Sequence, residues 1–202
     1  MASTPDTTPR ERAKADRSAA LLREAARLFA AKGFDGVSLE DLGSAVGITG
    51  PAVYRHFRSK QALLGALLQR TSERLLDGGR AVVDAHGTAT DQLRALVAFH
   101  VNFAVDESDV IRAQDRGLGR LEQDDRREVR RLQREYIDLW IDVLSHLHPG
   151  ASRDRLRVQA HAGFGLINST PHSLRALRTA HDDGEVREIL AAAAYAALTA
   201  GH

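Results

Sequence analysis

Apolar residues recur along this chain at intervals of three and four, the spacing that places side chains on one face of an α-helix. The first such segment begins near Asp16 and is expected to end at Gly33, because glycine readily adopts the left-handed conformation that closes a helix. Its apolar face consists of Leu21, Leu22, Ala25, Leu28 and Phe29. Residues 1–9 contain two prolines among small polar residues and are expected to form a disordered tail.

Two short helices are predicted next. Ser38 and Asp41 have the spacing of a capping box, in which the serine caps the helix and the acidic side chain three residues later caps the serine. Gly47 is expected to end this helix within about two turns. Thr49 can cap the following helix, with Pro51 in its first turn, where the missing N–H is tolerated. Two short helices joined by a tight glycine turn indicate a helix-turn-helix.

The remainder of the chain is also predicted to be helical. Ser59 is expected to cap a fourth helix, and further helices are expected near residues 89–105, 108–120, 124–147, 152–170 and 184–200. Nowhere does an apolar–polar alternation with a period of two persist, so no strand is predicted. The pattern therefore predicts an all-α fold.

The distribution of charge separates the N-terminal third from the rest. The whole chain has a formal net charge of only +1, whereas residues 10–60 carry ten basic and six acidic side chains. A basic segment on an otherwise near-neutral chain suits a module that binds a polyanion such as DNA. A solvated helix face that is basic for no functional reason is the alternative.

Composition excludes several classes of protein. The chain contains no cysteine, which excludes a disulfide framework and a thiolate metal site. No apolar run reaches the roughly 18–20 residues needed to span a membrane, and the first residues lack the apolar core of a secretory signal. His146 and His148 are two residues apart, which suits no metal site on one helix face. We therefore expect a cytoplasmic protein with neither metal nor cofactor and without a membrane partner.

Residues in the predicted helix-turn-helix closely resemble the DNA-binding domain of TetR-family transcriptional regulators. The resemblance is carried by residues 25–29, 32–34, 38–43, 46–49, 52–60 and 63–64, and one departure is Pro51, where many members have a small or basic residue. It implies an all-α homodimer that binds a palindromic operator. It further implies a DNA-binding domain over residues 10–60, and a ligand-sensing and dimerisation domain over residues 61–202.

The resemblance and the chemistry of the side chains together give a set of expected DNA contacts. Thr49, Gly50 and Pro51 begin the recognition helix, whose N-terminal end would enter the major groove. Phosphate contacts are expected from Ser38, Tyr54, His56 and Lys60, whereas Phe57 is expected in the core. Arg10 and Arg12 could form a minor-groove arm, although a disordered tail is the preferred interpretation.

A small-molecule site is expected where polar residues interrupt the apolar helices of the C-terminal part. The candidates are His100, Phe103, Arg112, Tyr136, Trp140, His161, Phe164 and Asn168. An apolar pocket with a few polar groups is what such a site requires. For each residue the alternative is a core or interface position with a satisfied hydrogen bond, and for Arg112 a solvated surface position.

The sequence therefore predicts a repressor that a small molecule releases from its operator. The alternative is a DNA-binding regulator without a ligand, whose C-terminal domain only dimerises or recruits a partner protein. An enzyme is not expected, because no nucleophile elbow, phosphate loop or paired acid–base motif is present. Residues 163–169 and 112–120 resemble actinobacterial TetR-type regulators of lipid and acyl-CoA catabolism, and a hydrophobic drug-like effector is the alternative.

Overall fold

The computed structural model describes residues 8–177 and 182–200, and over these ranges the chain is helical without any strand. The elements in order are α1 (Pro9–Lys32), α2 (Leu39–Ala45), α3 (Gly50–Tyr54), α4 (Lys60–Asp84), α5 (Ala89–Asp106), α6 (Ser108–Gly117), the 3₁₀ turn η1 (Leu118–Arg120), α7 (Gln123–Leu147), α8 (Arg153–Leu177) and α9 (Asp183–Thr199). The all-α prediction is confirmed. No helix in this part of the chain is both long and apolar enough to cross a membrane.

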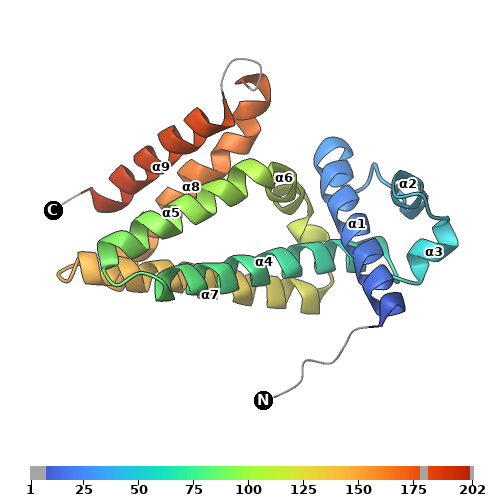
Figure 1. Ribbon diagram of the computed structural model, residues 1–202, viewed down its shortest axis with the longest axis horizontal. Coiled ribbons are helices and arrows are strands. Elements are labelled where there is room, and N and C mark those ends of the chain that lie inside the picture. The colour runs from blue at the N-terminus through green and yellow to red at the C-terminus, as the bar shows by residue number, and fades with distance from the viewer. Residues whose placement is uncertain (1–7, 178–181, 201–202) are drawn as a thin grey trace.

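The helices form two groups that share α4. Figure 1 shows α1–α3 at one end of the molecule and α5, α7, α8 and α9 around the far part of α4 at the other. Helix α6 lies between these groups, beside α1. The long helix α4 begins next to α3 and runs into the larger group, so it is a structural part of both groups.

Two hydrophobic cores follow this arrangement. The first joins α1, α2 and α3 to the first half of α4, and it also takes in Val110 and Ala113 of α6 and Val129 of α7. The second is built from α5, α7, α8 and α9 with Leu76 of α4 and Ile111 of α6. The predicted domain division at residue 60 therefore does not coincide with a gap in the packing, because the first core continues into α4, α6 and α7.

The predicted ends of the first four helices agree with the structure at most positions. Gly33 ends α1 at a positive φ of 75°, and Ser38 and Asp41 form the expected capping box at α2. Ser59 caps α4 by accepting a hydrogen bond from the N–H of Ala62. Thr49 occupies the N-cap position of α3, but its side chain makes no capping hydrogen bond. The backbone N–H at the second helical position can donate to an N-cap side chain, but this position is Pro51, which has no N–H.

The start of α1 corrects the sequence-based expectation. The helix begins at Pro9 and not near Asp16, because Thr8 and Glu11 form a capping box and proline occupies the first helical position. Of the expected disordered tail, residues 1–7 lie outside the described residues, and Thr8 and Pro9 belong to the helix start. Arg10 and Arg12 therefore lie in a helix, and not in an extended minor-groove arm. Helix α8 also continues to Leu177, beyond the expected end at residue 170.

Candidate nucleic-acid interface and ligand cavity

Close packing of α2 on α3 sets the geometry of the helix-turn-helix. A Cβ atom on Gly43 would lie 2.8 Å from the carbonyl oxygen of Ile48 and 2.9 Å from the Cγ2 atom of Val53, so only glycine allows this approach. Gly47 turns the chain between the helices with a φ of 70°. Val53 is fully buried and fixes α3 on the core, which leaves the opposite side of α3 exposed.

The residues expected at the start of the recognition helix lie on that outer side. Thr49 and Pro51 are exposed, and Gly50 is half-buried beside the side chain of Glu40. Because the Thr49 hydroxyl makes no capping hydrogen bond, it can form a hydrogen bond with a binding partner. The start of α3 therefore presents a short, uncrowded backbone and one hydroxyl to any partner.

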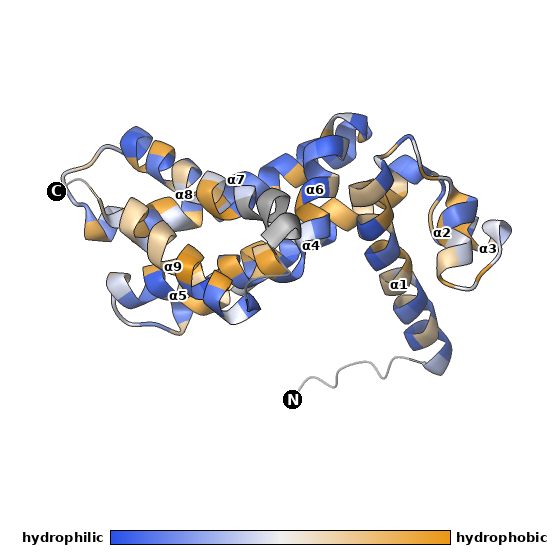
Figure 2. Cartoon of the chain, turned by 90° about the horizontal axis from the view of Figure 1, so that it is seen from above, coloured by the Kyte–Doolittle hydropathy of each residue, from blue (hydrophilic) through white to orange (hydrophobic). Residues whose placement is uncertain are grey.

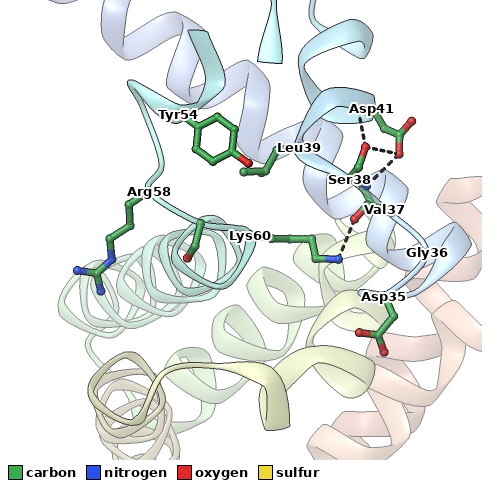
Figure 3. Close-up of a pocket in the computed structure, with 10 residues that line it drawn as sticks. Asp35, Gly36, Val37, Ser38, Leu39, Asp41, Tyr54, Arg58 and Lys60 are labelled. Carbon is green, nitrogen blue, oxygen red and sulfur yellow. Dashed lines mark hydrogen bonds between the residues drawn. The ribbon is translucent and has the colours of Figure 1, made fainter. Parts of the chain in front are cut away.

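An open groove of about 590 Å³ lies beside α3 and is lined by the loop before α2, the end of α3 and the start of α4. Ser38, Tyr54 and Lys60 all line it, so three of the expected phosphate contacts meet at one place (Figure 3). Tyr54 is 53% exposed, and its ring extends toward Leu39 in Figure 3. Asp35 and Asp41 also line the groove, but Asp35 pairs with Arg120 and Asp41 is engaged in the capping box. The pKa of Asp41 is lowered by hydrogen bonds from Ser38, so this carboxylate remains charged.

Lys60 has a structural role that the sequence did not indicate. Its ammonium donates a hydrogen bond of 2.8 Å to the carbonyl oxygen of Val37 and lies 4.4 Å from the centre of the Phe34 ring. It thereby ties the start of α4 to the loop between α1 and α2. Two of its three N–H donors remain for other partners.

His56 and Phe57 lie just after α3, following its C-cap residue Arg55. Phe57 is buried in the first core, as expected. Burial lowers the pKa of His56 below its usual value, and the neighbouring cations of Arg17, Lys14 and Arg55 lower it further. His56 therefore lies in a positively charged environment that would attract a phosphate.

A cavity of about 220 Å³ lies among α4, α5, α6, α7 and α8. Six of the expected ligand-site residues line it: His100, Phe103, Tyr136, His161, Phe164 and Asn168. Trp140 and Arg112 do not. Trp140 is almost fully buried behind the cavity, with its ring centroid 4.9 Å from that of Phe164, and the guanidinium of Arg112 pairs with Asp109.

Sequence reasoning missed the lining contributed by α4, α6 and the middle of α7. These residues are Ser72, Leu75, Val110, Ile111, Gln114, Asp115, Gln133 and Ile137. Gln133 donates a hydrogen bond of 3.0 Å to Gln114 and so joins α7 to α6 at the cavity wall. Isolated amide residues on helices resemble solvent-exposed positions, and nothing in the local sequence distinguishes them.

His100 is the buried polar centre of the cavity. Its Nε2–H donates to the side-chain oxygen of Asn168 at 3.1 Å, and the hydroxyl of Tyr136 donates to its Nδ1 at 3.4 Å. This arrangement fixes a neutral imidazole, because one ring nitrogen donates and the other accepts. Burial lowers the pKa of His100 to about 4.

Family models match both parts of the chain. Residues 21–67 match the bacterial regulatory proteins of the tetR family, and residues 86–172 match the tetracyclin repressor-like C-terminal domain. The repressor KstR2 of Mycolicibacterium smegmatis is 30% identical over 146 residues, which cover 69% of this chain and 67% of that protein. The chain belongs to the TetR family of transcriptional regulators.

Two further similarities agree with this family. The activator FasR of Mycolicibacterium smegmatis is 29% identical over 93 residues, which cover 46% of this chain and 42% of FasR, less than half of its length. A TetR-family regulator from Bordetella parapertussis has a similar structure, with a TM-score of 0.78, 25% identity and coverage of 92% of this chain and 95% of that one. The relatives thus include both an activator and a repressor.

Two substitutions should separate phosphate binding from stability. Tyr54→Phe is expected to leave the free energy of unfolding unchanged and to lower DNA affinity at least about tenfold, because a hydrogen bond to a charged group contributes about 1.5–3 kcal/mol. Lys60→Met keeps the aliphatic stem but removes the bond to Val37, and should lower the free energy of unfolding by about 2 kcal/mol. Chemical denaturation and DNA-binding titrations measure the two effects. An unchanged stability of Lys60→Met would show that its link to Val37 contributes nothing.

His100 should make stability depend on pH. Its pKa of about 4 in the folded protein lies below the value of about 6.5 expected for an unfolded chain, so the unfolded state binds more protons between these values. The free energy of unfolding should therefore fall as the pH decreases from about 6.5 to about 4, by roughly 3 kcal/mol at most. Denaturation of His100→Phe across this range should show a flatter profile than that of the wild-type protein. Identical profiles for the two proteins would contradict the assignment.

Proposed function

We propose that this protein is a homodimeric repressor that binds a palindromic operator and leaves it when a compact, uncharged molecule occupies the C-terminal cavity. In this proposal the protein regulates transcription without catalysing a reaction, and it acts in the cytoplasm, where the chromosome lies. The observation that carries the switch is the position of α6. One face of this helix lines the cavity, while the helix also packs in the core of the DNA-binding helices.

The DNA-binding part of the proposal rests on the exposed side of α3 and the groove beside it. Thr49, Gly50 and Pro51 would face base edges in the major groove, as in other helix-turn-helix proteins. Tyr54, Ser38 and the free N–H groups at the start of α4 would bind one phosphate at the groove, where the helix end also favours an anion. His56 and the remaining donors of Lys60 would contribute positive charge there.

The dimer would form through α8 and α9. Both helices carry small or apolar side chains on their solvent side: Val158, Ala162 and Gly165 on α8, and Ile189, Ala192, Ala193, Ala196 and Ala197 on α9. Val158 is 70% exposed and Ile189 is 59% exposed, so each adds a large apolar side chain to the small residues exposed on the same helix. Small residues at helical spacing allow two helix pairs to pack closely. A second copy would bury both stripes and set the recognition helices roughly 34–36 Å apart, one turn of DNA.

Coupling between the cavity and DNA would run through α6 and α4. Val110 lines the cavity and also belongs to the first core, while Arg116 donates to the carbonyl oxygen of Ala30 in α1 at 3.1 Å. Arg120, just after α6, pairs with Asp35 in the loop before α2 at 2.6 Å. A ligand that displaces α6 would therefore move α1, and with it the spacing of the recognition helices.

The lining of the cavity favours a compact, uncharged effector. A cavity of about 150 Å³ accepts benzene, so 220 Å³ suits a molecule with roughly ten heavy atoms. The described lining contains aromatic rings, amides and hydroxyls, with neither lysine nor arginine, and Asp115 is its one carboxylate. An acyl-CoA thioester carries several phosphate charges and is much larger. The hydrophobic effector is therefore preferred to the acyl-CoA one.

Dimerisation can be tested on α9. Ala193→Glu with Ala197→Glu should weaken self-association and operator binding together, because two carboxylates in each subunit would be buried in the interface. Ala81→Glu with Ala98→Glu adds the same charge at exposed positions of α4 and α5 and should change neither. Sedimentation and DNA titration measure both quantities. A wild-type monomer at micromolar concentration that still binds a palindrome tightly would contradict the dimer.

The switch requires reciprocal coupling. Mass spectrometry of molecules that co-purify with the protein would supply a candidate effector, and a randomised duplex library would supply the operator. A saturating effector that lowers operator affinity about 100-fold corresponds to roughly 2.7 kcal/mol, and the operator must weaken the effector by the same factor. Phe164→Trp should fill the cavity and abolish this response while operator affinity stays near normal. An operator affinity that no co-purifying molecule changes would favour the regulator without a ligand.

A further inference from the structure

The first two turns of α1 project beyond the core of the DNA-binding helices. All residues from Pro9 to Arg17 are exposed, and the first buried residue of the helix is Leu21. Figure 2 shows this part of α1 extending away from α2 and α3 on the side of the N-terminus. Core packing therefore does not hold these turns. Their helical form rests on the capping box at Thr8 and on helix-favouring residues such as alanine.

Three basic side chains share one face of this projection. At 3.6 residues per turn, Arg10, Lys14 and Arg17 fall within an arc of about 60°. Leu21 and Leu28 continue the same face and are buried, so the basic face lies on the side of α1 that faces the domain. The acidic residues lie elsewhere: Asp16 is more than a quarter turn away, and Glu11 is engaged in the capping box. Within the described residues, Arg10, Lys14 and Arg17 form no ion pair.

This face is electrostatically continuous with the recognition helix. The charges of Lys14 and Arg17 act on His56, which follows α3, and the cationic Arg55 lies there too. A cluster of like charges without acidic partners raises the energy of the free protein and is relieved by an anion. The surface that extends from α3 to the first turns of α1 is therefore suited to follow a phosphate backbone.

We propose that the segment Pro9–Arg17 is a helical arm that binds the phosphates of duplex DNA flanking the bases read by α3. The proposal rests on the proposed DNA-binding function and extends it to a surface outside the helix-turn-helix. The contacts involve charge and not base edges, so they lengthen the footprint and add affinity without adding sequence preference. Arg10, at the far end of the arm, reaches furthest from the half-site.

The salt dependence of binding tests this arm. Each phosphate contact contributes about 0.9 to the slope of log affinity against log salt concentration on B-form DNA. Lys14→Gln with Arg17→Gln in both subunits of a dimer should therefore lower the slope by up to about 3–4. The probe is a duplex selected by the wild-type protein from a randomised library, with long flanks beyond each half-site.

A matched control removes the same charge from the other face. Arg23→Gln with Arg27→Gln changes two exposed arginines on the outer side of α1 and should leave the slope near the wild-type value. Trimming the flanks of the duplex should weaken wild-type binding more than binding by Lys14→Gln with Arg17→Gln, which retains only Arg10 of the three arm cations. Arg10→Gln should lose affinity only on the long duplex. Circular dichroism and thermal melting confirm that each variant is folded.

The outcomes separate this proposal from the proposed function. Equal slopes for the arm variant and its control, with a wild-type protein that selects a palindrome, would overturn the arm and leave the regulator intact. A wild-type protein that selects no duplex from the library would instead overturn the DNA-binding function. A lower slope in the arm variant alone, together with a weaker dependence on flank length than in the wild-type protein, supports the arm.

Discussion

The apolar packing of α1 against α4 and α6 is the interaction on which the rest of this structure depends. Helices α1, α2 and α3 bury too little surface to be stable alone, and their hydrophobic core is completed by Leu64 of α4 and Val110 of α6. Gly117 at the end of α6 lies so close to Leu64 that a Cβ atom would meet its Cδ2 at 2.8 Å. A close-packed interface transmits a displacement, because it has few voids to absorb one.

Polar groups have opposite roles at the two ends of this packed unit. At the DNA-binding end they are exposed or only partly engaged, as with Tyr54 and Lys60, so they retain capacity for an anion. In the cavity they satisfy one another: Asn168 and Tyr136 occupy both nitrogens of His100. A buried polar network of this kind is costly to disturb, which makes a specific response to an occupant physically reasonable.

Local sequence was sufficient for much of the DNA-binding end. Helix caps, glycine turns and helical periodicity are short-range signals. They correctly predicted the helix ends and turns at Gly33, Ser38, Gly47 and Ser59. The start of α1 was missed because its first two turns have no apolar face, and only the capping box at Thr8 marks it. Helical periodicity cannot detect a helical segment without a buried apolar face. The spacing of Thr8 and Glu11, which is that of a capping box, could have predicted this helix start.

The sequence by itself determined an all-α chain, its helix-turn-helix and the family to which these belong. Only the tertiary structure decided which polar residues from five helices meet at one cavity, because these pairings join residues as distant as His100 and Asn168. It also placed Trp140 behind the cavity and paired Arg112 with Asp109, and it turned the Lys60 ammonium toward Val37. The physical reason is that helical periodicity gives the face on which a side chain lies, whereas the neighbour of that face depends on how the helices pack.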